Sequence, residues 1–203
     1  MATPTPRSAA LPPLVYVLAT FGVITGSYGA WGAINSISMF AKPREVYLAA
    51  VTAQNEALKP FVDAPALEAF DAHEADARYG RRNAALPLAG VGLVLSCLMF
   101  AGAMRAMRGD GWGLSAWSFS AAACIPYQLV SLALTMVTAR DLGKAVAALP
   151  PMAQIFVGNA QLLASIFFCA LAILYYGVCV IYLRTPGVKR AFSGGAGRTP
   201  PSA

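Results

Sequence analysis

The residue types that could bind a metal or move a proton gather in one short stretch of the chain. Asp71, His73 and Glu74 lie within four consecutive positions, and His73 is the only histidine in the sequence. A helix-borne zinc site needs a second histidine four residues after the first, and position 77 is alanine. We therefore interpret these residues as a solvated helix face, and the sequence predicts neither a metal site nor a cofactor.

Uncharged polar residues form a second candidate site, which is a small polar pocket. The set comprises Tyr127, Gln128, Ser131, Asn159 and Gln161. The first three follow Pro126, whose missing backbone hydrogen bond favours a kink in a helix. Hydrogen bonds between membrane helices, at ~0.6 kcal/mol each, also explain such residues. A ligand pocket near Pro126 is the alternative to simple helix packing.

The elements that position these residues are long apolar stretches. Residues 14–40, 86–104, 114–137 and 162–183 contain no Asp, Glu, Lys, Arg or His, and each is long enough to cross a bilayer as a helix. Only 12% of the whole chain is charged and its mean hydropathy is +0.59, whereas soluble proteins contain about 25% charged residues. The sequence predicts an all-α integral membrane protein with four transmembrane helices in a bundle.

Residues 41–85 are predicted to form a small helical extramembrane segment between the first two spans. Their spacing predicts one helix over residues 44–59 and a second that begins after Asp63, whose side chain we expect to act as the N-cap. In the second helix Glu74 and Arg78 have the i,i+4 spacing of a favourable ion pair.

The ends of the chain and the last loop have their own patterns. Residues 1–13 contain four prolines and are predicted to be a disordered lead. The apolar run that follows is longer than the 7–15 residues of a signal peptide, which favours an uncleaved anchor. Residues 142–149 suggest a short interfacial turn. Residues 184–203 are predicted to be a disordered basic tail.

Small residues line one face of the first span. Gly22, Gly26, Gly29 and Ala33 recur at helical spacing, and bulky side chains occupy the opposite face. Membrane helices approach closely through such faces. We expect this face to be a helix-packing surface that is covered by the other spans. A dimer face or a groove for a partner's helix is the alternative.

Charge suggests the orientation and the setting. The net charge of +6 is scattered over loops and tail, so it indicates no nucleic-acid surface. Basic residues near the span ends divide evenly between the two sides. The acid-free basic tail and the turn with Arg105 and Arg108 favour cytoplasmic termini. Abundant Arg, Ala and Gly suggest a bacterial protein, and hence the plasma (inner) membrane.

These patterns favour a function in association. The outline is similar to that of claudin-type tetraspan proteins, but residues 41–85 lack the Trp and the cysteine pair of that family's first loop, so the sequence assigns no family. We expect a non-enzymatic multi-pass protein that is an accessory or scaffold subunit, or a homo-oligomer. Its partners would be the lipid bilayer and other membrane subunits or itself. A small-molecule transporter or channel is the alternative.

Overall fold

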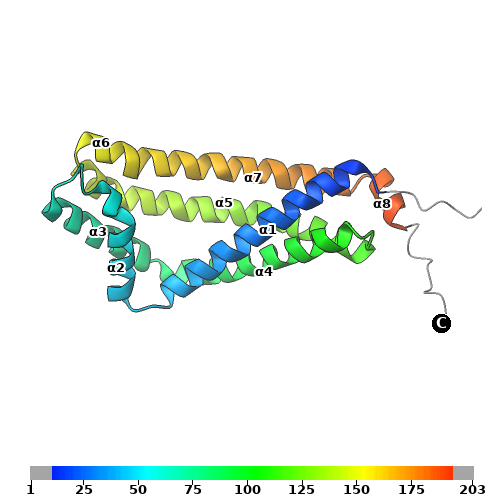
Figure 1. Ribbon diagram of the computed structural model, residues 1–203, viewed down its shortest axis with the longest axis horizontal. Helices are drawn as coiled ribbons and strands as arrows, with labels where there is room; N and C mark the ends of the chain where they lie inside the picture. The colour runs from blue at the N-terminus through cyan, green and yellow to red at the C-terminus, as the bar shows by residue number, and fades with distance from the viewer. Residues whose placement is uncertain (1–10, 194–203) are drawn as a thin grey trace, which may run out of the picture. The chain divides into compact units, whose positions relative to one another are not determined.

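Four long helices dominate the computed structural model, which describes residues 11–193 except for the side chains of four of them. Those four are Phe156, Gly158, Asn159 and Gln161. The long helices are α1 (Pro13–Phe40), α4 (Arg82–Ala106), α5 (Gly111–Ala147) and α7 (Gln161–Leu183) (Figure 1). All four are long and apolar enough to cross a membrane, which confirms the predicted number.

The third long helix, α5, differs most from its prediction. It runs to Ala147 and holds Pro126 in its interior. The interfacial turn predicted for residues 142–149 is therefore wrong, because residues 142–147 belong to this helix. No glycine pair or proline interrupts residues 138–149, and Pro150 is the first residue that cannot continue the helix.

The chain forms two compact units. Of the described residues, unit 1 comprises 11–31, Leu93–Ile125 and 174–193. Unit 2 comprises Gly32–Gly92 and Pro126–Ile173. Each long helix contributes one part to each unit. The candidate site lies wholly within unit 2.

In unit 1 the small-residue face of α1 lies against α4. A Cβ added at Gly26 would stand 2.8 Å from Phe100 N and 2.9 Å from Ser96 O, both backbone atoms of α4. A Cβ added at Gly22 would stand 3.0 Å from Ala103 Cβ. The two backbones thus approach as closely as small-residue faces allow, and the neighbour that covers this face belongs to the same chain.

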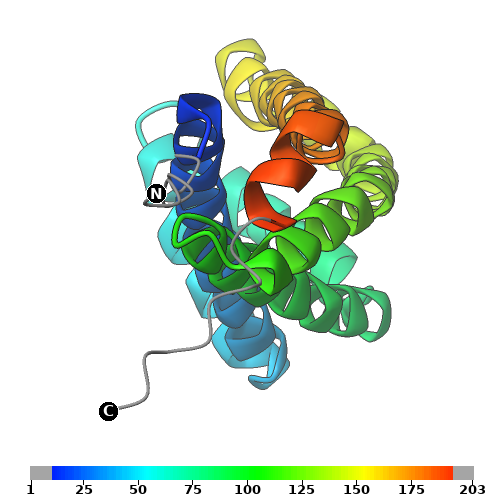
Figure 2. The ribbon, with the colours of Figure 1, turned by 90° about the vertical axis from the view of Figure 1, so that its right-hand side faces the viewer.

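The C-terminal part of unit 1 contains a helix that the sequence analysis missed. The tail was expected to be disordered from residue 184, but Pro186–Ser193 form α8, which turns away from α7 in Figure 2. Val188 and Phe192 are buried and are four residues apart, so they share one face of this helix. Burial of these two side chains explains why a segment rich in bases is helical. Residues 194–203 of the predicted tail lie outside the described residues.

In unit 2 the segment between α1 and α4 is helical, as predicted. It consists of α2 (Arg44–Gln54), the 3₁₀ turn η1 (Asn55–Leu58) and α3 (Ala64–Tyr79). Asp63 takes the N-cap position of α3 but makes no side-chain cap bond, so that expectation was wrong. Pro65 at the second helical position removes one of the two N–H groups that such a cap can bond, and the other, of Ala66, is not used by the Asp63 side chain.

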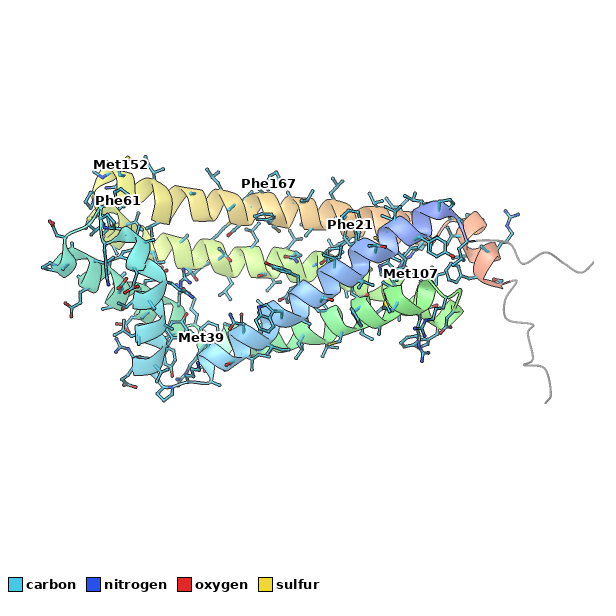
Figure 3. All side chains as sticks on the ribbon, viewed as in Figure 1. Phe21, Met39, Phe61, Met107, Met152 and Phe167 are labelled. Atoms are coloured by element: carbon cyan, nitrogen blue, oxygen red, sulfur yellow. The ribbon has the colours of Figure 1, made fainter. Side chains whose placement is uncertain are left out.

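Two clusters of buried side chains fix these short helices. Tyr47, Val51 and Ala75 pack together with Met39, which lies where α1 ends in Figure 3. A second cluster joins α3 to the chain around α6 (Pro151–Gln154) and the π-helical turn η2 (Ile155–Ala160). Its buried members are Leu58, Val62, Leu67, Phe70, Leu149 and Ala153. The first cluster holds α2 and α3 near the end of α1, and the second holds α3 beside the end of α5.

Candidate functional site

Unit 2 contains a cavity of about 630 Å³, here called the main cavity. Its lining comes from the unit-2 parts of α1, α4, α5 and α7, from α3, and from α6 and η2. One charged pair, Glu74 and Arg78, belongs to the lining. The hydroxyl-bearing residues of the lining are Ser36, Tyr127, Ser131, Thr135, Thr138 and Ser165. The large apolar residues are Phe40, Leu88, Leu134, Leu142, Val146, Val157 and Leu162.

Helical spacing on α5 produces the hydroxyl wall of the main cavity. Ser131, Thr135, Thr138 and Leu142 follow one another at intervals of three or four residues, so they share one face. Thr135 Oγ1 donates to Ser131 O at 3.0 Å, and Thr138 Oγ1 donates to a carbonyl one turn back at 2.8 Å. Both threonine hydroxyl groups donate their hydrogen to a backbone carbonyl of α5. Their oxygens can therefore act toward a ligand mainly as hydrogen-bond acceptors.

A glycine makes room for the one tyrosine of this wall. A Cβ added at Gly92 on α4 would meet Tyr127 Oη directly. A larger residue at this position would therefore displace the tyrosine ring. The predicted pocket residue Tyr127 owes its place to a glycine on the facing helix.

The charged end of the main cavity lies on α3. Arg78 Nη2 stands 2.5 Å from Glu74 Oε1, as the i,i+4 spacing predicted. Only 6% of the Glu74 side chain and 28% of the Arg78 side chain are exposed. The ion pair is thus largely removed from solvent, and its geometry matters more than that of a surface pair.

The interpretation of Asp71, His73 and Glu74 as a solvated face was wrong for two of the three residues. Asp71 is 2% exposed and Glu74 is 5% exposed, whereas His73 is exposed. The two carboxylates lie on the stripe of α3 that also carries Leu67 and Phe70, which the hydrophobic cluster buries. The apolar residues of this helix recur at a spacing of three to four, and the two acids fall on the same face. This pattern was the signal that could have revealed their burial.

A shared amide holds the two buried carboxylates. Asn55 Nδ2 donates to Asp71 Oδ1 at 2.7 Å and to Glu74 Oε2 at 2.8 Å. Beside them, burial raises the pKa of the Tyr47 hydroxyl above its ordinary value of 10.0, while the positive charge of Arg78 opposes that rise. Asn55, which the sequence analysis did not single out, is therefore the residue that organises the charged end.

A second, smaller cavity adjoins the charged pair. This side cavity of about 280 Å³ is lined by Gln54, Asn55, Ala57, Leu58, Glu74, Arg78 and Val157. Glu74, Arg78 and Val157 also line the main cavity. The ion pair thus contributes to the lining of both cavities.

The other predicted pocket residues lie in different places. Tyr127 and Ser131 line the main cavity. Gln128 is not among the lining residues, and its backbone oxygen accepts a bond from Cys169 Sγ at 3.6 Å. The side chains of Asn159 and Gln161 lie outside those that the structure describes.

The predicted helix-packing residues lie apart from the cavity lining. Gly22, Gly26 and Gly29 belong to unit 1, where each faces α4, and a Cβ at Gly29 would meet Ser96 Oγ. Ala33 belongs to unit 2 and is 7% exposed.

Comparisons with protein-family models, with curated proteins and with solved structures find no match to this chain. Within residues 11–193, as far as their side chains are described, no group of three or more His, Cys, Asp or Glu side chains could hold a metal ion. The polar groups that the main cavity presents are hydroxyls, the Glu74–Arg78 ion pair and the amide of Gln154.

Proposed function

We propose that this chain is a non-enzymatic multi-pass membrane protein of the transporter or channel class, which binds a small molecule in the main cavity. The observation that carries this proposal is the cavity itself. Its volume of about 630 Å³ falls within the ~300–1,000 Å³ of small-molecule sites. Its lining combines apolar surface with a few convergent polar groups, which is the usual composition of such sites.

The length of α5 supports a position of this site at the membrane surface. A helix of 37 residues is ~55 Å long, whereas the hydrocarbon core is ~30 Å thick. The last turns of α5 would then continue beyond the bilayer, where Asp141 forms an ion pair with Arg81. In this arrangement α2 and α3 form an extramembrane segment over a four-helix bundle. The hydroxyl wall lies at membrane depth and the charged end lies at the surface.

The setting that we propose is the inner membrane of a bacterium, with both termini in the cytoplasm. The acid-free basic tail and the Arg105/Arg108 turn support this orientation. It would place α2, α3 and the charged end of the cavity on the periplasmic side.

Species that co-purify with the protein test the proposal even though the ligand is unidentified. Wild type and Ser131→Trp are purified from native membranes in mild detergent, and bound small molecules are identified by mass spectrometry. The indole of Ser131→Trp fills the main cavity, so a specific species should be lost. Val130→Trp is the matched control, because Val130 is 56% exposed on the same helix. Identical species in all three preparations would contradict the proposal. A species that is lost serves next as the solute in liposome flux assays.

Association with other membrane proteins, which the sequence favours, is a second proposal. The observation that favours it is apolar exposure on the segment proposed to lie outside the bilayer, where Val46 is 46% exposed and Phe61 is 49% exposed. The glycine face of α1 supports this proposal less, because α4 covers Gly22, Gly26 and Gly29 within unit 1. Co-purification of a membrane partner with wild type and its loss from Val46→Asp would support association. Retention of the same partner by Val46→Asp would count against this surface.

A further inference from the structure

We propose that the main cavity takes an amphiphile with a cationic head, which lies at Glu74, and an apolar body, which lies along the hydroxyl wall of α5. This inference rests on the proposed function, because it names the class of ligand for the same cavity. Three features of the described residues carry it: the polarity of the lining, the balance of the buried charges, and the free space next to the charged pair.

The polarity of the lining gives a ligand two different ends. Glu74 and Arg78 supply all the formal charge of the lining, and both lie on α3. Around the rest of the cavity the lining is mainly apolar, with hydroxyls whose donors, at Thr135 and Thr138, are used within α5. A charged head fits only at α3, and an apolar body fits along α5.

The balance of buried charge sets the sign of that head. Four ion pairs in unit 2 each match one base with one acid: Arg44–Asp76, Lys59–Glu56, Arg78–Glu74 and Arg81–Asp141. In the described part of this unit Asp71 forms no ion pair, although it is 2% exposed. Its carboxylate accepts a hydrogen bond from the neutral amide of Asn55, which also holds Glu74. The buried cluster therefore carries two carboxylates and one guanidinium.

An uncompensated buried charge is costly, and a counter-charge at short range relieves that cost. A cation beside Glu74 supplies this counter-charge, since Asn55 links Glu74 to Asp71 by two bonds of 2.8 and 2.7 Å. An anion beside Arg78 would instead add to the excess of negative charge. The cluster thus favours a positively charged head group over a negatively charged one.

Free space next to the pair, in both cavities, lets a head approach it. Glu74 and Arg78 line the main cavity and also the side cavity of about 280 Å³. Phe40 belongs to the main lining, and its ring stacks on Tyr47 at a centroid distance of 5.5 Å. An aromatic ring in the lining of the same cavity adds a favourable surface for an organic cation.

Two probes of matched size and opposite charge test the inference. Tetraphenylphosphonium and tetraphenylborate differ chiefly in sign. The binding of each probe is measured with the purified full chain, for wild type and for the filled-cavity variant Ser131→Trp. Subtracting the second value from the first removes the binding of the probe to detergent and lipid. We expect the cation to bind at least tenfold more tightly than the anion, and this comparison requires no variant in the charged cluster.

Three variants then locate the source of the preference. Glu74→Gln keeps an acceptor for Asn55 and should weaken cation binding about tenfold or more. Asp71→Asn also removes one negative charge, at a buried residue that does not line the cavity. It tests the same inference if Glu74→Gln does not fold. Asp76→Asn is the matched control, because its carboxylate is 57% exposed and paired with Arg44 at the surface. It should leave binding unchanged.

The outcomes separate this inference from the proposed function. Equal or tighter binding of the anion, or no cavity-dependent binding of the cation, would overturn the cationic assignment. An unchanged affinity in both Glu74→Gln and Asp71→Asn would overturn it as well. The proposed function is decided separately by the co-purified species that Ser131→Trp loses. If the cavity retains a neutral or anionic species, the proposed small-molecule binding stands and the assignment of a cationic ligand is wrong.

Discussion

Asn55 and Asp71 are joined by a hydrogen bond of 2.7 Å from Nδ2 to Oδ1, which ties η1 to the buried stripe of α3. The second hydrogen of the same amide is donated to Glu74 Oε2 at 2.8 Å. One neutral side chain thus satisfies two acidic neighbours on the next helix. The amide of Asn55 therefore links the two carboxylates to each other and to η1.

Removal of the amide is expected to destabilise the protein strongly. Asn55→Ala deletes two hydrogen bonds to charged groups, each worth about 1.5–3 kcal/mol, so we expect the free energy of unfolding to fall by about 3 kcal/mol. Asn55→Asp should be at least as damaging, because it places a third carboxylate beside the other two. Unfolding in a series of detergent mixtures, followed by circular dichroism, measures the change.

The neighbouring Gln54 provides the control for this substitution. Gln54 is exposed, and Gln54→Ala should change the free energy of unfolding by less than ~0.5 kcal/mol. If Asn55→Ala is as stable as Gln54→Ala, the shared amide does not hold the cluster.

Two glycines on α4 should respond in opposite ways to alanine. A Cβ at Gly102 would lie 2.6 Å from Trp117 N, a backbone atom of α5 in unit 1. We expect Gly102→Ala to cost about 1–3 kcal/mol through overpacking. Around Gly90 no heavy atom of the described residues lies within 4 Å of the added Cβ, so Gly90→Ala should be neutral or stabilise by up to ~1 kcal/mol. Thermal unfolding in mild detergent compares the two, and equal midpoints would refute the close contact of α4 with α5.

The spans and the short helices were predictable because their signals are local. A helix that crosses a membrane needs about 20 consecutive apolar residues, and this requirement is visible in the chain whatever its neighbours in space are. Prolines at positions 43 and 60 bracket α2 and η1 in the same local way. Glu74 and Arg78 are one turn apart, so their pairing also follows from spacing alone.

The cavity and the hydrogen-bond partner of the two buried acids were not predictable, because they depend on contacts distant in sequence. Asp71 and Glu74 are residue types that usually lie at the surface, and the residue whose amide donates to both of them, Asn55, lies 16 and 19 positions away in the sequence. The sequence identified a small-residue face on α1, but only the structure shows that Ser96 and Phe100 of α4 cover it. Pairwise placement of helices is information that no single apolar run contains.

The buried tyrosine of α2 should make stability fall at alkaline pH. Burial is the main cause that raises the pKa of Tyr47 in the folded protein above 10.0. In the unfolded chain the hydroxyl therefore loses its proton at a lower pH than in the folded protein. The stability that comes from keeping Tyr47 neutral is present below pH 10.0 and is lost as the pH rises through the folded pKa.

A comparison with phenylalanine isolates this effect. Tyr47→Phe removes the ionisation but keeps the ring that stacks on Phe40. We expect wild type to lose more stability than Tyr47→Phe between about pH 9 and pH 11, as thermal midpoints across that range would record. Parallel losses in the two proteins would mean that other groups cause the alkaline fall.

A tyrosine of α7 should contribute measurably to the packing of unit 1. Tyr175 Oη donates to Leu18 O at 2.9 Å, which connects α7 to α1. Hydrogen bonds between membrane helices contribute ~0.6 kcal/mol on average and at most ~1.7 kcal/mol, so Tyr175→Phe should lower the free energy of unfolding by about 1 kcal/mol. Tyr28→Phe removes a hydroxyl from a side chain that is 79% exposed and should have no effect. Unfolding titrations of both variants in the same detergent would show the difference, and an equal effect would mean that this bond does not stabilise the contact of α7 with α1.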